Sequence, residues 1–126
     1  MVRVSAVIKL MKTVAVPTFT ATIWIGTKNR DTGGIISNEE ILASIQSFVD
    51  GMGQCVSVTP TTFVYKNGNE PGLAIGFINY PRFPATAELI FETAEMLARQ
   101  LKELAAQYKV TIVCPDRTIM LSTEPA

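Results

Sequence analysis

The stretch FTATIWIGT, residues 19–27, alternates apolar and polar side chains along its length. Ala21, Ile23 and Ile25 fall on one side, while the threonines and Trp24 fall on the other. An alternation with a period of two predicts a half-buried β-strand, because successive side chains of a strand point to opposite faces of its sheet. This strand therefore needs a covering layer on one side only. Trp24 is unusual on the polar side, where a large ring meets water.

Two amphipathic helices are predicted as that layer. The sequence SNEE at 37–40 places a serine three positions before a glutamate, which is a capping box and predicts a helix start. Apolar side chains follow at helical spacing until Gly51 and Gly53, which favour a helix end. A longer apolar stripe at the same spacing predicts a second helix over about 86–108.

Alternating and β-branched residues predict four further strands, at 54–66, 72–80, 109–114 and 118–122. We expect the first of these to be broken or bulged at Pro60. The sequence NGNEPG at 67–72 predicts a glycine-rich turn, which leaves Glu70 in a loop. The predicted order is β-α-β-β-α-β-β, an α+β fold with a mostly antiparallel sheet and two helices on one face. Residues 19–126 form a single domain, and residues 1–18 are an N-terminal extension or a further strand.

Length and composition limit the function. A chain of 126 residues with 48% hydrophobic and 17% charged residues is expected to fold on its own core. It also has apolar surface to spare, which predicts a homo-oligomer. Eleven basic side chains balance eleven acidic ones, which argues against binding of duplex DNA or RNA. No run of 18 apolar residues is present, so no membrane span is expected.

The residues that usually carry catalysis are scarce. The sequence has no histidine, which removes the common general base near neutral pH and the partner that activates serine or cysteine nucleophiles. Cys55 and Cys114 stand alone, without the spacing of a zinc site. No metal or cofactor is predicted. Most glutamates fall on helix surfaces, and Asp116 is the one acid in a position of interest. These observations favour a protein that is not an enzyme.

Planar side chains gather at the predicted strand ends instead, both before and after the hairpin turn and in the last turn: Phe63, Tyr65, Tyr80, Arg82, Phe83 and Arg117. Rings and guanidinium groups stack on nucleobases, and arginine also pairs with phosphate. Each aromatic residue has a structural alternative, whereas Arg82 and Arg117 lie in turns without an obvious local partner. Phe63 can belong to the core, the tyrosines can cap the sheet, and Phe83 can pack against the following helix. The residues alone predict an oligomeric domain that could bind a small planar anion.

Several segments resemble the phage anti-Thoeris sponge family. The similar segments span about residues 19–122 and are FTATIWIG (19–26), CVSVTPTTFVY (55–65), GNEPG (68–72), GFINYPRFP (76–84) and VTIVCPDRTIMLS (110–122). The most specific parts are INYPRFP and PDRTIML. The resemblance implies a non-enzymatic protein that sequesters cyclic ADP-ribose isomers made by bacterial TIR proteins. It also implies dimers that assemble into hexamers, cyclic trinucleotides at a second site in some members, and action in the cytoplasm of the infected bacterial host.

The resemblance also suggests roles for the residues at the matching positions. Phe83 would stack on one face of the adenine. Arg117 would stack on the other face of the adenine or bind the diphosphate, and Arg82 would pair with phosphate. Asp116 or Asn79 would bind the ribose hydroxyls.

Lys28 and Arg30, beside Trp24 near a strand end, predict a second anion site. Two other functions stay open at this point: an enzyme acting on nucleotides, and an interaction module whose exposed rings meet another protein.

Overall fold

The computed structural model describes residues 10–123, which form one sheet and two helices. The elements are β1 (Thr20–Gly26), α2 (Asn38–Met52), β2 (Val56–Tyr65), β3 (Gly68–Ile78), α3 (Ala87–Leu104), β4 (Lys109–Val113) and β5 (Thr118–Ser122). The predicted α+β class and the order β-α-β-β-α-β-β are both confirmed. Residues 10–18 hold no helix or strand, and the rest of the predicted extension lies outside the described residues.

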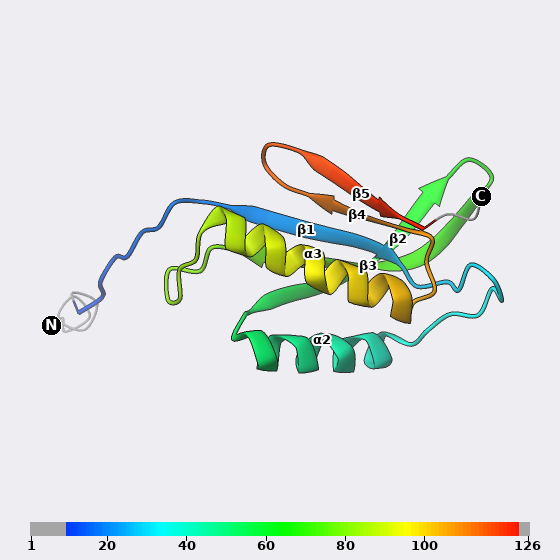
Figure 1. Ribbon diagram of the computed structural model, residues 1–126, viewed down its shortest axis with the longest axis horizontal. Helices are drawn as coiled ribbons and strands as arrows, with labels where there is room; N and C mark the ends of the chain where they lie inside the picture. The colour runs from blue at the N-terminus through cyan, green and yellow to red at the C-terminus, as the bar shows by residue number, and fades with distance from the viewer. Residues whose placement is uncertain (1–9, 124–126) are drawn as a thin grey trace, which may run out of the picture.

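The five strands form one sheet in the order β2-β3-β1-β4-β5, with every neighbouring pair antiparallel (Figure 1). β1, the strand that contains the alternating segment, is therefore the central strand. Trp24 lies across from Ala74 of β3 on one side and from Thr111 of β4 on the other.

One face of this sheet carries the hydrophobic core. Both helices lie on that face, with α3 running along β1 (Figure 1). Five elements contribute to this core: Ala21, Ile23 and Ile25 of β1, Leu73, Ile75 and Phe77 of β3, Ile90, Ala94, Leu97 and Leu101 of α3, Ile41 and Ile45 of α2, and Val110 and Ile112 of β4. The predicted alternation of β1 and the first part of the predicted α3 stripe are both seen in this burial.

Within residues 10–123, no helix covers the opposite face of the sheet (Figure 1). We call this the open face. Several large apolar side chains on it are exposed to water, including Trp24, Ile78, Val113 and Met120. Soluble monomers rarely expose a broad apolar surface of this kind.

The helix ends follow the capping residues. Ser37 caps α2 and accepts a hydrogen bond from the Glu40 amide at 3.1 Å, as the capping box predicted. Gly53 ends α2 with φ at 67°. Thr86 caps α3. The predicted end of the second helix near residue 108 is wrong, because Ala106 has φ at 52° and breaks the helix before β4.

The hairpin between β2 and β3 differs most from the prediction. Its turn consists of Lys66 and Asn67 alone, and Asn67 takes φ at 65°. The predicted turn at 67–72 is therefore wrong, and Glu70 lies in β3 opposite Phe63. The predicted break at Pro60 is also wrong. β2 is an edge strand, where a proline without an N–H can face away from the ladder and leave the pairing with Leu73 intact.

Candidate functional site

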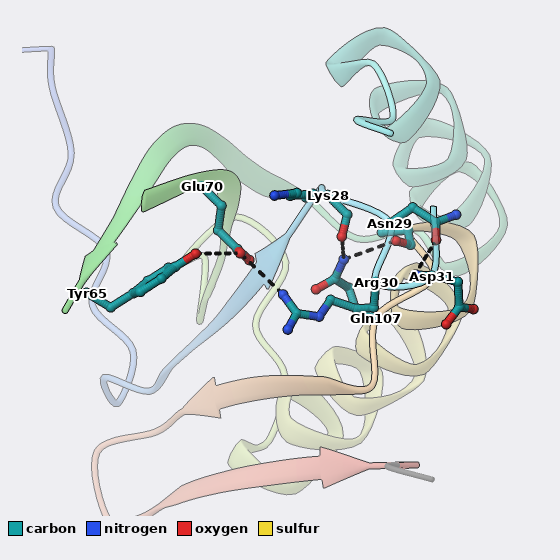
Figure 2. Close-up of polar contacts among 8 residues, drawn as sticks. Lys28, Asn29, Arg30, Asp31, Tyr65, Glu70 and Gln107 are labelled. Atoms are coloured by element: carbon teal, nitrogen blue, oxygen red, sulfur yellow. Dashed lines mark hydrogen bonds and ion pairs between the residues drawn. The ribbon is translucent and has the colours of Figure 1, made fainter. Parts of the chain in front are cut away.

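The β2–β3 hairpin brings a carboxylate, a phenol and a guanidinium together at one end of the sheet. Glu70 Oε2 accepts a hydrogen bond from the Tyr65 hydroxyl at 3.2 Å and meets Arg30 at 3.3 Å (Figure 2). The Glu70 side chain is only 12% exposed, whereas that of Arg30 is 45% exposed. A largely buried carboxylate needs such donors, because burial without them costs several kcal/mol, as an order of magnitude.

Arg30 reaches Glu70 from the loop that follows β1. Asn29 builds this loop by accepting hydrogen bonds from the amides of Asp31, at 2.8 Å, and Thr32, at 3.1 Å. An asparagine side chain that binds the amides after it stabilises a tight turn. The Arg30 amide also donates to the Ala106 carbonyl at 3.1 Å, which ties the loop to the corner between α3 and β4.

Gln107 ties the same loop down from that corner. Its Nε2 donates to the Lys28 carbonyl at 2.6 Å and to the Ala105 carbonyl at 3.1 Å. The residue is 8% exposed. Two carbonyl partners require the amide nitrogen on that side, so the Gln107 Oε1 atom is directed the other way, toward Gly26 and Glu70.

Aromatic rings flank this cluster on the open face. Phe63 lies over Gly72, where an added Cβ would come within 2.2 Å of its ring. Trp24 makes an edge-to-face contact with Phe63, with ring centroids 6.4 Å apart. Gly72 therefore has to remain a glycine for Phe63 to lie where it does. The rings of Trp24 and Phe63 thus form an apolar surface next to the charged side chains of Glu70 and Arg30.

The Tyr65 hydroxyl keeps its proton at neutral pH. The pKa of Tyr65 is raised above its usual range. The largest cause is partial burial, followed by the hydrogen bond to Glu70 and the charge of Glu70, while the charge of Arg30 lowers it. A phenol in this setting donates a hydrogen bond to the carboxylate. It is not a base near pH 7.

A small cavity of about 210 Å³ adjoins the cluster, lined by Arg30, Gln107, Tyr108 and Lys109. Tyr108, one of these lining residues, donates a hydrogen bond to Asp31, and this bond raises the pKa of Tyr108. Pockets that enclose drug-sized ligands measure roughly 300–1,000 Å³. The cavity in this chain suits a small polar group and does not enclose a nucleoside.

The other end of the sheet holds most of the remaining predicted site residues. Phe83 is exposed and packs against Tyr80, with centroids 5.5 Å apart, and Arg82 is exposed in the same loop. Asn79 is used structurally. It donates to the Pro17 carbonyl at 2.8 Å and accepts from the Ala85 amide at 2.9 Å.

Arg117, in the turn between β4 and β5, also makes contacts within the chain. The Arg117 guanidinium lies 4.3 Å from the centroid of the Phe91 ring and 3.1 Å from the Asp116 carboxylate. Arg117 thus has a cation–π partner and an ion-pair partner within the chain.

The structure therefore divides the predicted residues between two ends of the sheet. Phe63 and Tyr65 lie with the predicted second-site residues Trp24, Lys28 and Arg30. Phe83, Arg82, Tyr80, Asn79, Arg117 and Asp116 lie at the opposite end, beside Thr20, Ile78 and Val113.

Glu70, which joins the first group, was not predicted as a site residue. The signal that could have found it is the dipeptide Asn67-Gly68, which is typical of a tight hairpin turn at this point of the chain and therefore leaves Glu70 in the second strand.

Among residues 10–123, no three His, Cys, Asp or Glu side chains lie together in a way that could hold a metal ion. No helix in this range is long and apolar enough to cross a membrane.

The sequence matches no protein-family model and no curated protein. Two solved structures match almost the whole chain. One is a phage SAM lyase in complex with S-methyl-5'-thioadenosine, with a TM-score of 0.75 and 17% identity over 91% of this chain and 97% of the other. The second is a phage SAM lyase in the apo state, with a TM-score of 0.77 and 17% identity over 93% of this chain and 98% of the other. The chain has the fold of a phage SAM lyase.

This match overturns three predictions: membership of the anti-Thoeris sponge family, sequestration of cyclic ADP-ribose isomers, and a protein that is not an enzyme. The structures that share the fold are lyases. The segments behind the resemblance fail for a physical reason. INYPRFP and PDRTIML each join a turn to the end of a strand, and the prolines and charges of such turns set local geometry that is compatible with many folds. Absence of histidine was also a weak argument, since it excludes only chemistry that needs a base or acid near pH 7.

Proposed function

We propose that this protein is an enzyme that degrades S-adenosylmethionine (SAM) and releases S-methyl-5'-thioadenosine. The observation that carries the proposal is the match over 91–93% of the chain to SAM lyase structures, one of them with S-methyl-5'-thioadenosine bound. Those lyases are phage proteins, and we extend that origin to this chain, which would act inside an infected bacterial cell.

The reaction suits a chain without histidine. S-methyl-5'-thioadenosine is SAM without its four-carbon amino-acid part, so the bond between the sulfur and Cγ must break. Both electrons of that bond stay on the sulfur, which leaves as a neutral thioether because it starts as a sulfonium ion. No acid has to protonate the leaving group.

The carbon side can be completed in two ways that consume no water. The substrate's own carboxylate can attack Cγ and form a lactone, or a base can take a proton from Cβ and leave an alkene. Both routes require the amino-acid part to be held in one conformation, and orientation of this kind supplies much of an enzyme's rate enhancement.

The cluster at Glu70 supports this function through the groups it offers. Trp24 and Phe63 are rings on which adenine can stack, a contact worth about 1–3 kcal/mol. Glu70 and Arg30 carry one negative and one positive charge within 3.3 Å of each other. An α-amino acid carries the complementary pair, an ammonium group and a carboxylate.

We also propose that the pocket is completed by a second copy of the chain. Trp24, Ile78, Val113 and Met120 are exposed on the open face, and the cavity of about 210 Å³ beside Glu70 is too small for a nucleoside. A homo-oligomer that covers this face would bury the rings and enclose the ligand.

Paired variants test the site. Glu70→Gln keeps the shape of the side chain and removes its charge, and we expect it to lower kcat/KM for SAM by about a hundredfold, because the substrate is no longer oriented. Asp116→Asn removes a similar charge at the other end of the sheet and should leave the rate within about twofold. The measurement is release of S-methyl-5'-thioadenosine, followed by mass spectrometry, which also identifies the four-carbon product. Equal rates in wild type and Glu70→Gln would remove this cluster from the reaction.

A further inference from the structure

The Glu70 carboxylate uses its two oxygens differently. Tyr65 and Arg30 both meet Oε2, at 3.2 Å and 3.3 Å. Oε1 lies over Gly26, 3.0 Å from the position that a Cβ on that glycine would take. Oε2 is therefore used for contacts within the chain, and Oε1 lies above Gly26 at the end of β1.

The Gln107 amide oxygen lies at the same place. Gln107 Oε1 is also 3.0 Å from the position of a Gly26 Cβ. Its orientation is fixed, because Nε2 of the same amide donates to the carbonyls of Lys28 and Ala105. Two acceptor oxygens, one of them charged, thus converge over a residue that has no side chain.

We propose that Glu70 and Gln107 together bind the α-ammonium group of the substrate. This inference rests on the proposed SAM-degrading function and assigns the amino-acid end of the substrate to this corner of the site. An ammonium group has three N–H donors and no acceptor, which fits two converging oxygens. Charge-assisted hydrogen bonds of this kind are about twice as strong as neutral ones.

The neighbouring groups fit the same assignment. The Arg30 guanidinium is 45% exposed and lies next to the same carboxylate, so it is available to the substrate's carboxylate. The adjoining cavity of about 210 Å³ has room for a small polar group, and its other lining residues, Tyr108 and Lys109, are also polar.

The sulfonium ion is the other cation that SAM could place here, and catalysis argues against it. The sulfur loses its positive charge as the bond to Cγ breaks. A carboxylate beside it would therefore stabilise the substrate more than the transition state and would slow the reaction. The ammonium group keeps its charge throughout, so binding it costs nothing in rate.

Three stable ligands separate these contributions in a binding experiment. S-adenosylhomocysteine has the ammonium and carboxylate but no sulfonium. Its deamino analogue, 5'-S-(3-carboxypropyl)-5'-thioadenosine, lacks only the ammonium. S-methyl-5'-thioadenosine lacks the whole amino-acid part. Titration calorimetry on the wild-type protein should show S-adenosylhomocysteine binding at least about tenfold more tightly than the deamino analogue, as expected for charge-assisted hydrogen bonds.

Two variants then test the two oxygens. Gln107→Met removes the amide and should reduce the preference for S-adenosylhomocysteine over the deamino analogue to within about threefold, with binding of S-methyl-5'-thioadenosine unchanged. Gly26→Ala keeps both side chains and inserts a methyl group 3.0 Å from each of the two oxygens, which must then move apart by a few tenths of an ångström, so it should have the same selective effect. Gly26 has an ordinary strand φ, so alanine adds no backbone strain, and this variant answers the question if Gln107→Met fails to fold.

The outcomes are distinct. An equal loss of affinity for all three ligands in both variants would mean that Gln107 only holds the loop at Lys28, which overturns the inference. A wild-type preference below about twofold would overturn it as well. Failure of wild-type protein to bind S-methyl-5'-thioadenosine or to cleave SAM would instead remove the proposed function on which the inference rests.

Discussion

Glu70 and Tyr65 depend on each other at the scale of single residues. The phenol supplies a donor to a carboxylate that is 12% exposed, and the carboxylate in turn raises the pKa of the phenol. Partial burial is the larger cause of that rise. The hydrogen bond between them therefore favours the protonated form of Tyr65.

This coupling predicts how stability changes with pH. The pKa of Tyr65 in the folded chain lies above the value of about 10 for a free tyrosine, so the unfolded chain loses its proton first. Its contribution is complete below about pH 10 and is lost as the pH rises through the folded pKa. We expect the thermal midpoint of wild type to decrease as the pH rises above about 10, and the decrease to be smaller in Tyr65→Phe. Parallel curves for the two proteins would mean that Tyr65 does not contribute.

Most of the elements could be predicted because each depends on local patterns. The alternation in β1 and the capping box at Ser37 depend on neighbours within a few positions. Pro60 and Glu70 could not be placed in the same way. Pro60 is tolerated because β2 lies at the edge of the sheet, which only the strand order decides. Glu70 required the turn to be placed at Asn67 and not across the whole glycine-rich run.

The candidate site was harder to predict because it joins segments far apart in the sequence. Arg30 and Tyr65 were both identified, one for a second anion site and one for the main site, and the structure brings them together through Glu70. Gln107 gave no signal at all. Its position matters only because the α3–β4 corner packs beside the loop at Lys28.

Helix α2 offers a test at the scale of an element. Gly51 lies inside the helix, and an added Cβ would meet nothing within 4 Å, whereas Gly53 takes φ at 67°. Gly51→Ala should raise the free energy of unfolding by about 0.5–1 kcal/mol, because glycine loses more conformational freedom on folding than alanine. Gly53→Ala is the matched control and should lower it by about 1 kcal/mol, since alanine is strained at positive φ. Urea denaturation measures both, and the same sign of change for the two variants would contradict this assignment of the helix end.

At the scale of the whole molecule, the two helices cover one face of the sheet and leave the open face uncovered within residues 10–123 (Figure 1). Helices bury the apolar side of the sheet, while Trp24, Ile78, Val113 and Met120 remain exposed on the other. We expect the purified protein to be an oligomer in solution, with a mass at least twice the 13.7 kDa of one chain, because burial of these side chains drives association. Met120→Glu places a charge on this face, away from the Glu70 cluster, and should shift the mass toward that of one chain. Light scattering of both proteins is the measurement, and a wild-type monomer would contradict the proposed shared pocket.

Cleavage of SAM by the wild-type protein tests the proposed function most directly. The protein is incubated with a hundredfold excess of SAM, and S-methyl-5'-thioadenosine and intact SAM are counted by mass spectrometry against a sample without protein. We expect many molecules of S-methyl-5'-thioadenosine for each chain, with a matching loss of SAM. Quantitative recovery of unchanged SAM would contradict the proposal and leave the fold without the chemistry of the lyases that share it.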